Sequence, residues 1–410
     1  MANVSSSNGI EKYPKLRFPE FTEPWSHVKL SDFAGRVMRK NKNNETDLPL
    51  TISSKDGLVD QISFFSKTVA SKDISGYYLL LNGEYAYNKS YSVGYDFGSI
   101  KRLERYSMGA LSTLYICFAL RKYNSDYIKT YFDSLKWYKE IYMISAEGAR
   151  NHGLLNVPTD DFFDTYHYIT ENETEQEKIA KLMELIEQRI QKQQSLVDNL
   201  KKYKRGVVKT LLDPKKNKRH DVVWEIDAIG NLGTFIKGAA LTKADISDTG
   251  TPFILYGELY TTYKEVVRSI VRTTQANVDD VYLSRVGDVV VPTSGETPEE
   301  ISTASCIMVP DVILAGDLNI YRSTTVDGRI MSYLLNHIVN GQIARVAQGK
   351  SVVHVQASEI GKISITYPDH KEQERIAQIL ELLDNRIAAS EKSLNTMQKI
   401  KKALLQQLFI

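Results

Sequence analysis

The fold of this chain is decided by the stretch EQEKIAKLMELIEQRIQKQQSLVDNLKKYKRGVVKTLLD, residues 175–213, because the chain contains it twice. The second copy, EQERIAQILELLDNRIAASEKSLNTMQKIKKALLQQLFI, occupies residues 372–410. The two copies align without a gap at a constant offset of 197, and twelve of the 39 positions are identical. Repetition at a fixed offset indicates a duplicated structural unit.

Both copies carry the pattern of one long amphipathic helix. Their apolar residues recur at spacings of three and four, which places them along one seam of a helix of the coiled-coil type. Asn172 and Asp369 stand at the N-cap position with Glu175 and Glu372 three residues later, which is the capping-box pattern. The first helix should stop at Asp213-Pro214, since a residue before proline avoids the α region. Each helix of roughly 40 residues would be about 60 Å long, so the two should pack against each other.

The segment ARVAQGKS, residues 344–351, has the spacing of a loose phosphate-binding loop. Such a loop needs a strand before it and a helix after it, so that backbone N–H groups converge on phosphate. Here the flanks are reversed, because residues 330–344 have helical periodicity and SVVHVQ (351–356) alternates like a strand. ISAEGARNHG (144–153) also precedes the first helix as RVAQGKSVVH (345–354) precedes the second. We interpret the segment as part of the repeat.

The repeat extends into the segments before the helices. Trp25, Leu30 and Asp32 have the same spacing as Trp224, Ile229 and Asn231. We therefore expect an α+β protein in which two pseudo-two-fold-related α/β domains are separated by two long antiparallel helices that form a coiled coil. The expected parts are an N-terminal extension (1–20), a first domain (21–165), a central spacer helix (166–213), a second domain (214–366) and a C-terminal spacer helix (367–410).

The composition is that of a water-soluble globular protein with reduced cysteines. Of 410 residues, 42% are hydrophobic and 25% are charged, and the net charge is +2. The apolar run LSTLYICFAL (111–120) is too short to span a bilayer and predicts a buried strand. The N-terminal residues have no apolar signal core, which predicts a cytoplasmic location. Cys117 and Cys306 lie in apolar surroundings and are expected to be reduced core residues.

Motifs for catalysis are absent from the sequence, whereas features for recognition are present. The chain has no H-E-x-x-H, G-x-S-x-G or G-x-G-x-x-G motif, and its seven histidines are scattered. Two similar domains on a rigid spacer suit a ligand with two separated sites, and duplex DNA is such a ligand. Basic residues would then contact phosphate and polar loop residues would read base edges. A turn or core role is the competing interpretation for any one of them. The candidate DNA-binding residues are Lys89, Ser90, Tyr91, Lys101, Arg102, Arg105, Glu147, Arg150, Asn151, Tyr256, Glu258, Tyr263, Lys264, Thr293, Ser294, Gln348, Lys350 and Ser351.

These features together resemble the specificity (S) subunits of type I restriction–modification systems. The resemblance is carried by YPKLRFPEF (13–21) before Trp25, by the two helix starts EQEKIA and EQERIA, and by the glycine element before each helix. FIKGAALTKADI (235–246), GTPFILYGEL (250–259) and GDVVVPTSGE (287–296) belong to the same set. The sequence departs from the pattern at Thr170-Glu171, where a proline is common.

The resemblance implies that each domain is a target recognition domain for one half of a bipartite DNA sequence. The helices would set the gap, about 6–7 base pairs for half-sites one turn apart, and dock two modification (methyltransferase) subunits. Those partners would bind S-adenosylmethionine, and two restriction subunits would use ATP and Mg, so this chain would need no cofactor or metal and would be no enzyme. The residues expected to bind partner subunits are Ile179, Leu182, Ile186, Ile376, Ile379 and Leu383.

Two alternatives stay open from the sequence. One is a coiled-coil scaffold with two protein-binding modules, which predicts no DNA sequence preference. The other is a specificity chain that serves a fused methylase–nuclease.

Overall fold

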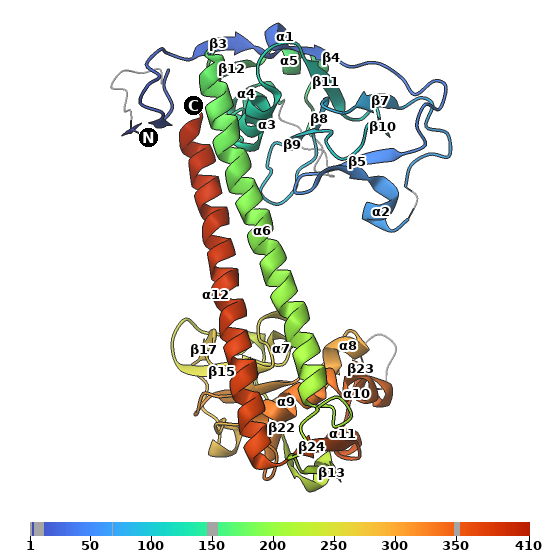
Figure 1. Cartoon of the computed structure of the whole chain (residues 1–410), viewed down its shortest axis with the longest axis vertical. Coiled ribbons are helices and arrows are strands. Elements are labelled where there is room, and N and C mark those ends of the chain that lie inside the picture. Colours follow the sequence, from blue (N-terminus) through green and yellow to red (C-terminus); the bar gives the residue numbers. More distant parts are fainter. Residues whose placement is uncertain (1, 4–11, 68, 146–154, 348–352) are drawn as a thin grey trace. The chain divides into compact units, whose positions relative to one another are not determined.

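The computed structural model describes residues 2–3, 12–67, 69–145, 155–347 and 353–410. The chain divides into two compact units. Unit 1 comprises residues 1–193 and 393–410, and unit 2 comprises residues 194–392. Each long helix contributes to both units, because α6 (Glu173–Leu211) and α12 (His370–Leu408) both pass a unit boundary (Figure 1). Both units mix helices and strands, as expected from the sequence.

Unit 1 is built around two four-stranded sheets, with strand orders β6-β5-β10-β7 and β4-β11-β8-β9. Strand β10 pairs with β5 in parallel and with β7 in antiparallel orientation. The predicted buried strand at 111–120 is found as β11. The elements before α6 are β1 (Ala2–Asn3), β2 (Leu16–Arg17), β3 (Ser26–Lys29), α1 (Leu30–Phe33), β4 (Ala34–Arg36), β5 (Pro49–Ser53), β6 (Gly57–Asp60), α2 (Gln61–Phe65), β7 (Tyr78–Leu81), β8 (Tyr85–Asn88), β9 (Ser99–Arg102), β10 (Met108–Leu111), β11 (Ile116–Leu120), α3 (Ser125–Asp133), α4 (Tyr138–Ile144), α5 (Thr159–Phe163) and β12 (Tyr166–Ile169).

Unit 2 has a five-stranded sheet of order β14-β22-β18-β20-β16 and a three-stranded sheet of order β17-β15-β21. The segments GDVVVPTS (287–294) and GKISITY (361–367), which are rich in β-branched residues, contain β18 and most of β24. The elements are β13 (Trp224–Ala228), η1 (Ile229–Asn231), β14 (Gly233–Lys237), η2 (Lys243–Asp245), β15 (Thr251–Leu255), α7 (Glu258–Thr261), β16 (Val266–Val267), β17 (Arg272–Thr274), η3 (Asp280–Tyr282), β18 (Asp288–Pro292), β19 (Ser294–Gly295), α8 (Pro298–Ile301), β20 (Ser305–Ile307), β21 (Ile313–Ala315), β22 (Leu318–Ser323), α9 (Gly328–His337), α10 (Asn340–Val346), β23 (Val353–His354), α11 (Ala357–Gly361) and β24 (Ser364–Pro368).

The repeat seen in the sequence is a repeat of structure. In unit 1, β3 begins after Trp25 and pairs antiparallel with β12, the strand that leads into α6. In unit 2, β13 begins at Trp224 and pairs antiparallel with β24, the strand that leads into α12. The segment 166–213, expected to be a spacer helix, therefore includes the closing strand β12, whereas the segment 367–410 includes only the last two residues of β24. The helices begin at Glu173 and His370.

Parts of both long helices complete the hydrophobic core of each unit. In unit 1, Ile179 and Met183 of α6 and Leu405 of α12 lie in one core with Trp25. Phe409, just after α12, packs edge-on against Trp25 at a centroid distance of 5.9 Å. In unit 2, the core contains Val208 and Leu212 at the end of α6 together with Ile376, Ala377 and Leu380 of α12. Within each unit the helical segments run antiparallel.

The structure agrees with the predicted N-cap residues, with the predicted end of the first long helix to within two residues, and with the prediction of two buried cysteines. The side chains of Asn172 and Asp369 accept hydrogen bonds from the N–H groups of Glu175 and Glu372, both at 3.1 Å, so the N-cap prediction is confirmed. α6 ends at Leu211, two residues before Asp213. Cys117 and Cys306 are free and buried, and burial raises the pKa of each thiol to about 12.

Candidate nucleic-acid interface

The glutamine of each EQ motif connects the start of a long helix to the globular part of the unit in which that helix begins. Gln176 Oε1 accepts the N–H of Asn124 at 2.8 Å, and its Nε2 donates to the carbonyl of Thr170 at 2.8 Å. Gln373 repeats both contacts, with the N–H of Asp327 at 2.7 Å and the carbonyl of Pro368 at 2.8 Å.

The two backbone N–H groups held in this way belong to the N-cap residues of the helices that pack inside each unit. Asn124 caps α3 and Asp327 caps α9. Both glutamine side chains are buried. A buried amide that bonds one backbone group in a distant segment and another just before the helix holds the start of the long helix at a fixed place on its unit.

The glutamates of the same motif do not complete a capping box, which corrects the sequence expectation. The carboxylate of Glu175 is fully buried and accepts from Arg17 Nε at 2.7 Å and from the hydroxyl of Thr170 at 2.6 Å. The carboxylate of Glu372 pairs with Arg375 one turn further along α12, and this contact lowers the pKa of Glu372. In both copies the carboxylate binds an arginine side chain and not the backbone N–H of the N-cap residue. A hydrogen bond between two charged groups is stronger than one to a neutral N–H.

The long helices are joined by the same ion pair in each unit. In unit 1, Lys401 Nζ of α12 lies 2.7 Å from the carboxylate of Glu187 in α6. In unit 2, Lys204 Nζ of α6 lies 2.6 Å from the carboxylate of Asp384 in α12. Lys204 corresponds to Lys401 and Glu187 to Asp384 at the repeat offset of 197, so the two pairs are copies with the helices exchanged.

In unit 2 this ion pair is extended into the globular part. Lys204 also lies 2.9 Å from Glu265, whose carboxylate contacts His337 Nε2 at 2.7 Å. Tyr333 donates to Asp384 at 2.5 Å. Burial alone would raise the pKa of Glu265, but the hydrogen bonds from His337 and Lys204 lower it to about 2. α9 is thereby tied to both long helices.

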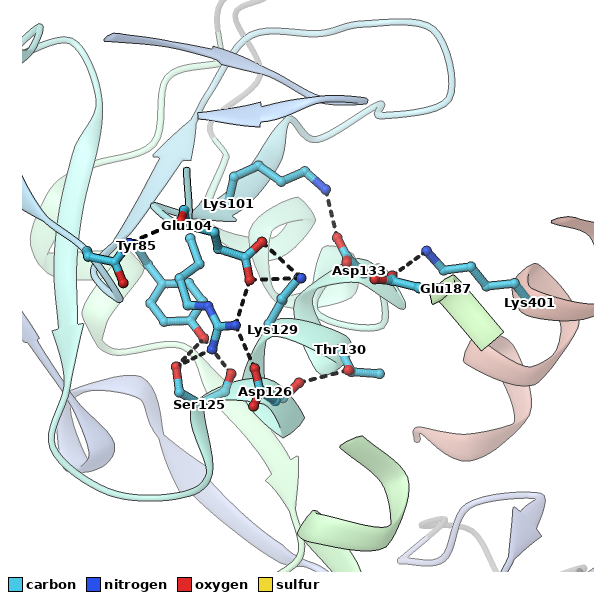
Figure 2. Close-up of polar contacts among 12 residues, drawn as sticks. Tyr85, Lys101, Glu104, Ser125, Asp126, Lys129, Thr130, Asp133, Glu187 and Lys401 are labelled. Carbon is cyan, nitrogen blue, oxygen red and sulfur yellow. Dashed lines mark hydrogen bonds and ion pairs between the residues drawn. The ribbon is translucent and has the colours of Figure 1, made fainter. Parts of the chain in front are cut away.

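Unit 1 has a basic hollow of about 610 Å³ at the corresponding place, between its globular part and the two long helices. Several of its wall residues are already paired. Lys101 lies 2.7 Å from the carboxylate of Asp133, and the two side chains point toward each other in Figure 2. Arg102 lies 2.6 Å from the carboxylate of Asp126. In the same view Lys401 points from α12 to Glu187 on α6. The lining contains four carboxylates against seven cationic side chains, which are Lys55, Lys101, Arg102, Arg105, Lys129, Lys401 and Lys402.

Three of these cations are free to meet a ligand. Lys55, Arg105 and Lys402 are exposed, and none has an ion pair to another described residue. The inner wall differs, because Glu104 accepts from Arg102 at 2.6 Å and from Lys129 at 3.0 Å. The hollow thus has a neutralised wall and an unpaired cationic rim, which suits an anionic ligand.

A different hollow, of about 900 Å³, lies in unit 2 along β14 and the start of β22. Thr293, His354 and the FIKGAALT segment line it. Asn319 lies at the same place, and its Nδ2 is buried with no hydrogen-bond partner in the described parts of the chain. Within those parts, no group of three or more His, Cys, Asp and Glu side chains could hold a metal ion, and the cofactor expectation stays a prediction.

The candidate DNA-binding residues differ in their exposure to solvent and in whether they are ion-paired. Tyr91 and Arg105 are exposed, as contact with DNA requires, and Lys264 is exposed but bonded to Glu391 at 3.1 Å. Lys89, Ser90, Tyr256, Tyr263 and Thr293 are half-buried, and Lys101 and Arg102 are half-buried and ion-paired. Glu147, Arg150, Asn151, Gln348, Lys350 and Ser351 lie outside the described residues.

Two candidates have structural roles that do not fit contact with bases. Glu258 is buried and accepts from Arg272 Nε at 2.9 Å, so its carboxylate is already used. Ser294 is buried in the β19–β23 pair and donates to Asp317 at 2.7 Å. Their loop position suggested recognition, but the side chains point into the unit.

The expected partner-binding residues lie mainly on the inner side of the helices. Ile179 and Ile376 are in the two cores and are 2% and 0% exposed, so a partner subunit cannot contact them directly. Leu182, Ile186 and Leu383 are partly buried against the same cores, and Ile379 is half-buried. The hydrophobic seam holds this chain together.

Other apolar side chains on the helices face outward, again in equivalent pairs. Leu185 is 51% exposed and its counterpart Leu382 is 70% exposed. Tyr203 and its counterpart Ile400 are 61% and 50% exposed. The repeat shows that these apolar positions are equivalent in the two helices, but only the packing shows that they face outward.

The fold defines a class of protein with two similar α/β units, each clamped to the same two long helices. Residues 222–399 match the family described as type I restriction modification DNA specificity domain. No curated protein matches the sequence. In the described parts of the chain, no helix has both the length and the apolarity needed to cross a membrane.

Two solved structures share the fold over nearly the whole chain. One comes from work on complex assembly and conformational transition of the type I R-M system; it has a TM-score of 0.60 at 14% identity, covering 94% of this chain and 97% of that chain. The other is the type I restriction–modification S subunit of M. genitalium, with a TM-score of 0.56 at 14% identity, covering 97% of this chain and 99% of that chain. Residues 222–399 are thus similar to the type I DNA specificity domain family, and the chain as a whole shares the fold of these two solved structures.

Proposed function

We propose that this chain is the DNA-recognition subunit of a type I restriction–modification complex. Each unit would read one half of a bipartite target, and the long helices would set the gap between the halves. The observation that carries the proposal is the duplicated clamp, in which Gln176 and Gln373 fix the two helix starts to the two units in the same way. A ligand read by two equivalent, rigidly held domains should itself have two equivalent halves.

The partners would be two modification subunits and two restriction subunits. The modification subunits would bind S-adenosylmethionine and methylate adenine, and the restriction subunits would use ATP and Mg, so that this chain contributes recognition and no catalysis. The repeated exposed pairs Leu185/Leu382 and Tyr203/Ile400 favour docking of two copies of one partner, because the same apolar positions are offered twice.

The proposal is tested by mapping DNA methylation in cells that express the modification subunit with and without this chain. We expect a new split motif with N6-methyladenine in each half only when the chain is present. If no motif is gained while the modification subunit is demonstrably present and assembled with the chain, the proposal is wrong. Methylation of the same motif in cells that lack this chain would also exclude the proposal.

A further inference from the structure

Each long helix carries a dibasic pair at the same place in the repeat. The pairs are Lys204-Arg205 in α6 and Lys401-Lys402 in α12, which correspond at the offset of 197. The first lysine of each pair is held by the opposite helix, through Asp384 or Glu187. Arg205 and Lys402 are instead exposed, and neither has an ion pair to another described residue.

Each of the two free cations lines a hollow in its own unit. Lys402 lines the basic hollow of unit 1. Arg205 lines a hollow of about 340 Å³ in unit 2, where Lys201, Lys204 and Lys264 are also present. Lys201 and Lys264 pair with Glu391, and Lys204 pairs with Glu265 and Asp384. In this lining Arg205 is therefore the cation with no ion pair to another described residue, and Lys402 likewise has none in unit 1. Like charges gathered around a hollow repel each other unless an anion neutralises them.

We propose that these two hollows are anion sites that bind phosphate groups of the DNA backbone. Lys402 and Arg105 would make the contacts in unit 1, and Arg205 would make the contact in unit 2. This inference rests on the proposed function and deepens it, because it assigns backbone contacts to the junctions between each globular part and the long helices. Such contacts position a protein on DNA without reading its sequence.

The chemistry of the unit 1 hollow favours DNA over an acidic segment of a partner protein. Protein interfaces draw most of their affinity from aromatic or aliphatic anchors in well-packed pockets. In unit 1 the aliphatic side chains that reach the hollow, such as Ile100 and Leu405, are buried in the unit itself. Its rim is formed by lysine and arginine side chains, and its lining includes the amides of Gln191 and Gln398. The N–H groups of these side chains can donate hydrogen bonds to phosphate oxygens.

The test uses Lys402→Gln, Arg105→Gln and Arg205→Gln in the complex of this chain with its modification subunit. Affinity is measured for a duplex with the recognition sequence and for an unrelated duplex, over a range of salt concentrations. Each substitution should weaken binding to both duplexes by the same factor. Each should also reduce the slope of log affinity against log salt by about 1, while the methylated motif stays the same.

Lys192→Gln and Lys209→Gln are matched controls, because these exposed lysines lie on α6 outside both hollows. Unchanged affinity and slope in the three hollow variants would overturn the inference. Loss of complex assembly with DNA binding intact would assign the hollows to an acidic protein segment, and a relaxed base preference would assign them to sequence reading; both outcomes overturn it. A wild-type complex that does not distinguish the two duplexes would instead contradict the proposed function.

Discussion

Lys401 Nζ lies 2.7 Å from the carboxylate of Glu187, and this contact joins α12 to α6 inside unit 1. Its copy in unit 2 joins Lys204 to Asp384 at 2.6 Å. The donor comes from α12 in one unit and from α6 in the other, because Lys401 and Lys204 occupy equivalent positions of the repeat. The same contact therefore joins the two helices within each unit.

Removal of the glutamine clamp should destabilise each unit. Gln176→Leu leaves the N–H of Asn124 and the carbonyl of Thr170 buried without partners, at a cost of about 1–3 kcal/mol. Gln373→Leu should cost a similar amount in unit 2. Urea unfolding measures both, and Gln188→Leu is the control, since the Gln188 side chain is exposed and donates to Glu184 on the same helix. Equal stability of all three variants would contradict a clamp.

The pH dependence of stability should include a contribution from Glu265. Its pKa is lowered from 4.5 to about 2, so the stabilisation is complete above pH 4.5 and is lost as the pH falls toward 2. The contribution is at most roughly 3 kcal/mol. The free energy of unfolding of Glu265→Gln should therefore fall less steeply below pH 4.5 than that of the wild type. Glu177→Gln, at an exposed position of α6, should leave the wild-type profile unchanged.

Charges at the exposed apolar pairs should weaken docking of the modification subunit. Leu185→Glu and Leu382→Glu together put two carboxylates where apolar contact is expected, and at least a tenfold loss of complex affinity should follow. The fold should tolerate them within about 0.5 kcal/mol, because both side chains are more than half exposed. Analytical ultracentrifugation measures assembly of the double variant and of each single variant, and Asn199→Glu adds one negative charge, as each single variant does, at another exposed site on α6. Full assembly of the double variant would exclude this surface.

An insertion in α6 should change the gap in the recognition sequence. Four residues added near Gln193 lengthen the helix by about 6 Å, close to two base-pair steps of DNA. Methylation mapping should show both half-sites unchanged with a different number of bases between them. The same four residues inserted between Asn43 and Asn44, in an exposed turn, should leave the gap unchanged. An altered half-site after the α6 insertion would contradict the spacer role.

Exchange of one domain should alter one half-site only. Replacing residues 21–165 by the corresponding domain of another specificity subunit keeps Gln176 and both long helices. The mapped motif should change in one half and keep the other half and the gap. A change in both halves would show that the units do not read DNA independently.

The sequence by itself determined the features that depend on near neighbours. The helix starts at Asn172 and Asp369 were readable because an N-cap contact spans only three residues, and the repeat then predicted the second unit from the first. Tertiary structure alone decided where longer-range partners lie. Glu175 has the capping-box position, yet its carboxylate pairs with Arg17, 158 residues away. Periodicity likewise predicted an apolar seam, but only packing decided that Ile179 faces the core while Leu185 faces outward. Such choices depend on which charges and surfaces the fold brings together, and a sequence pattern extending over a few residues does not contain that information.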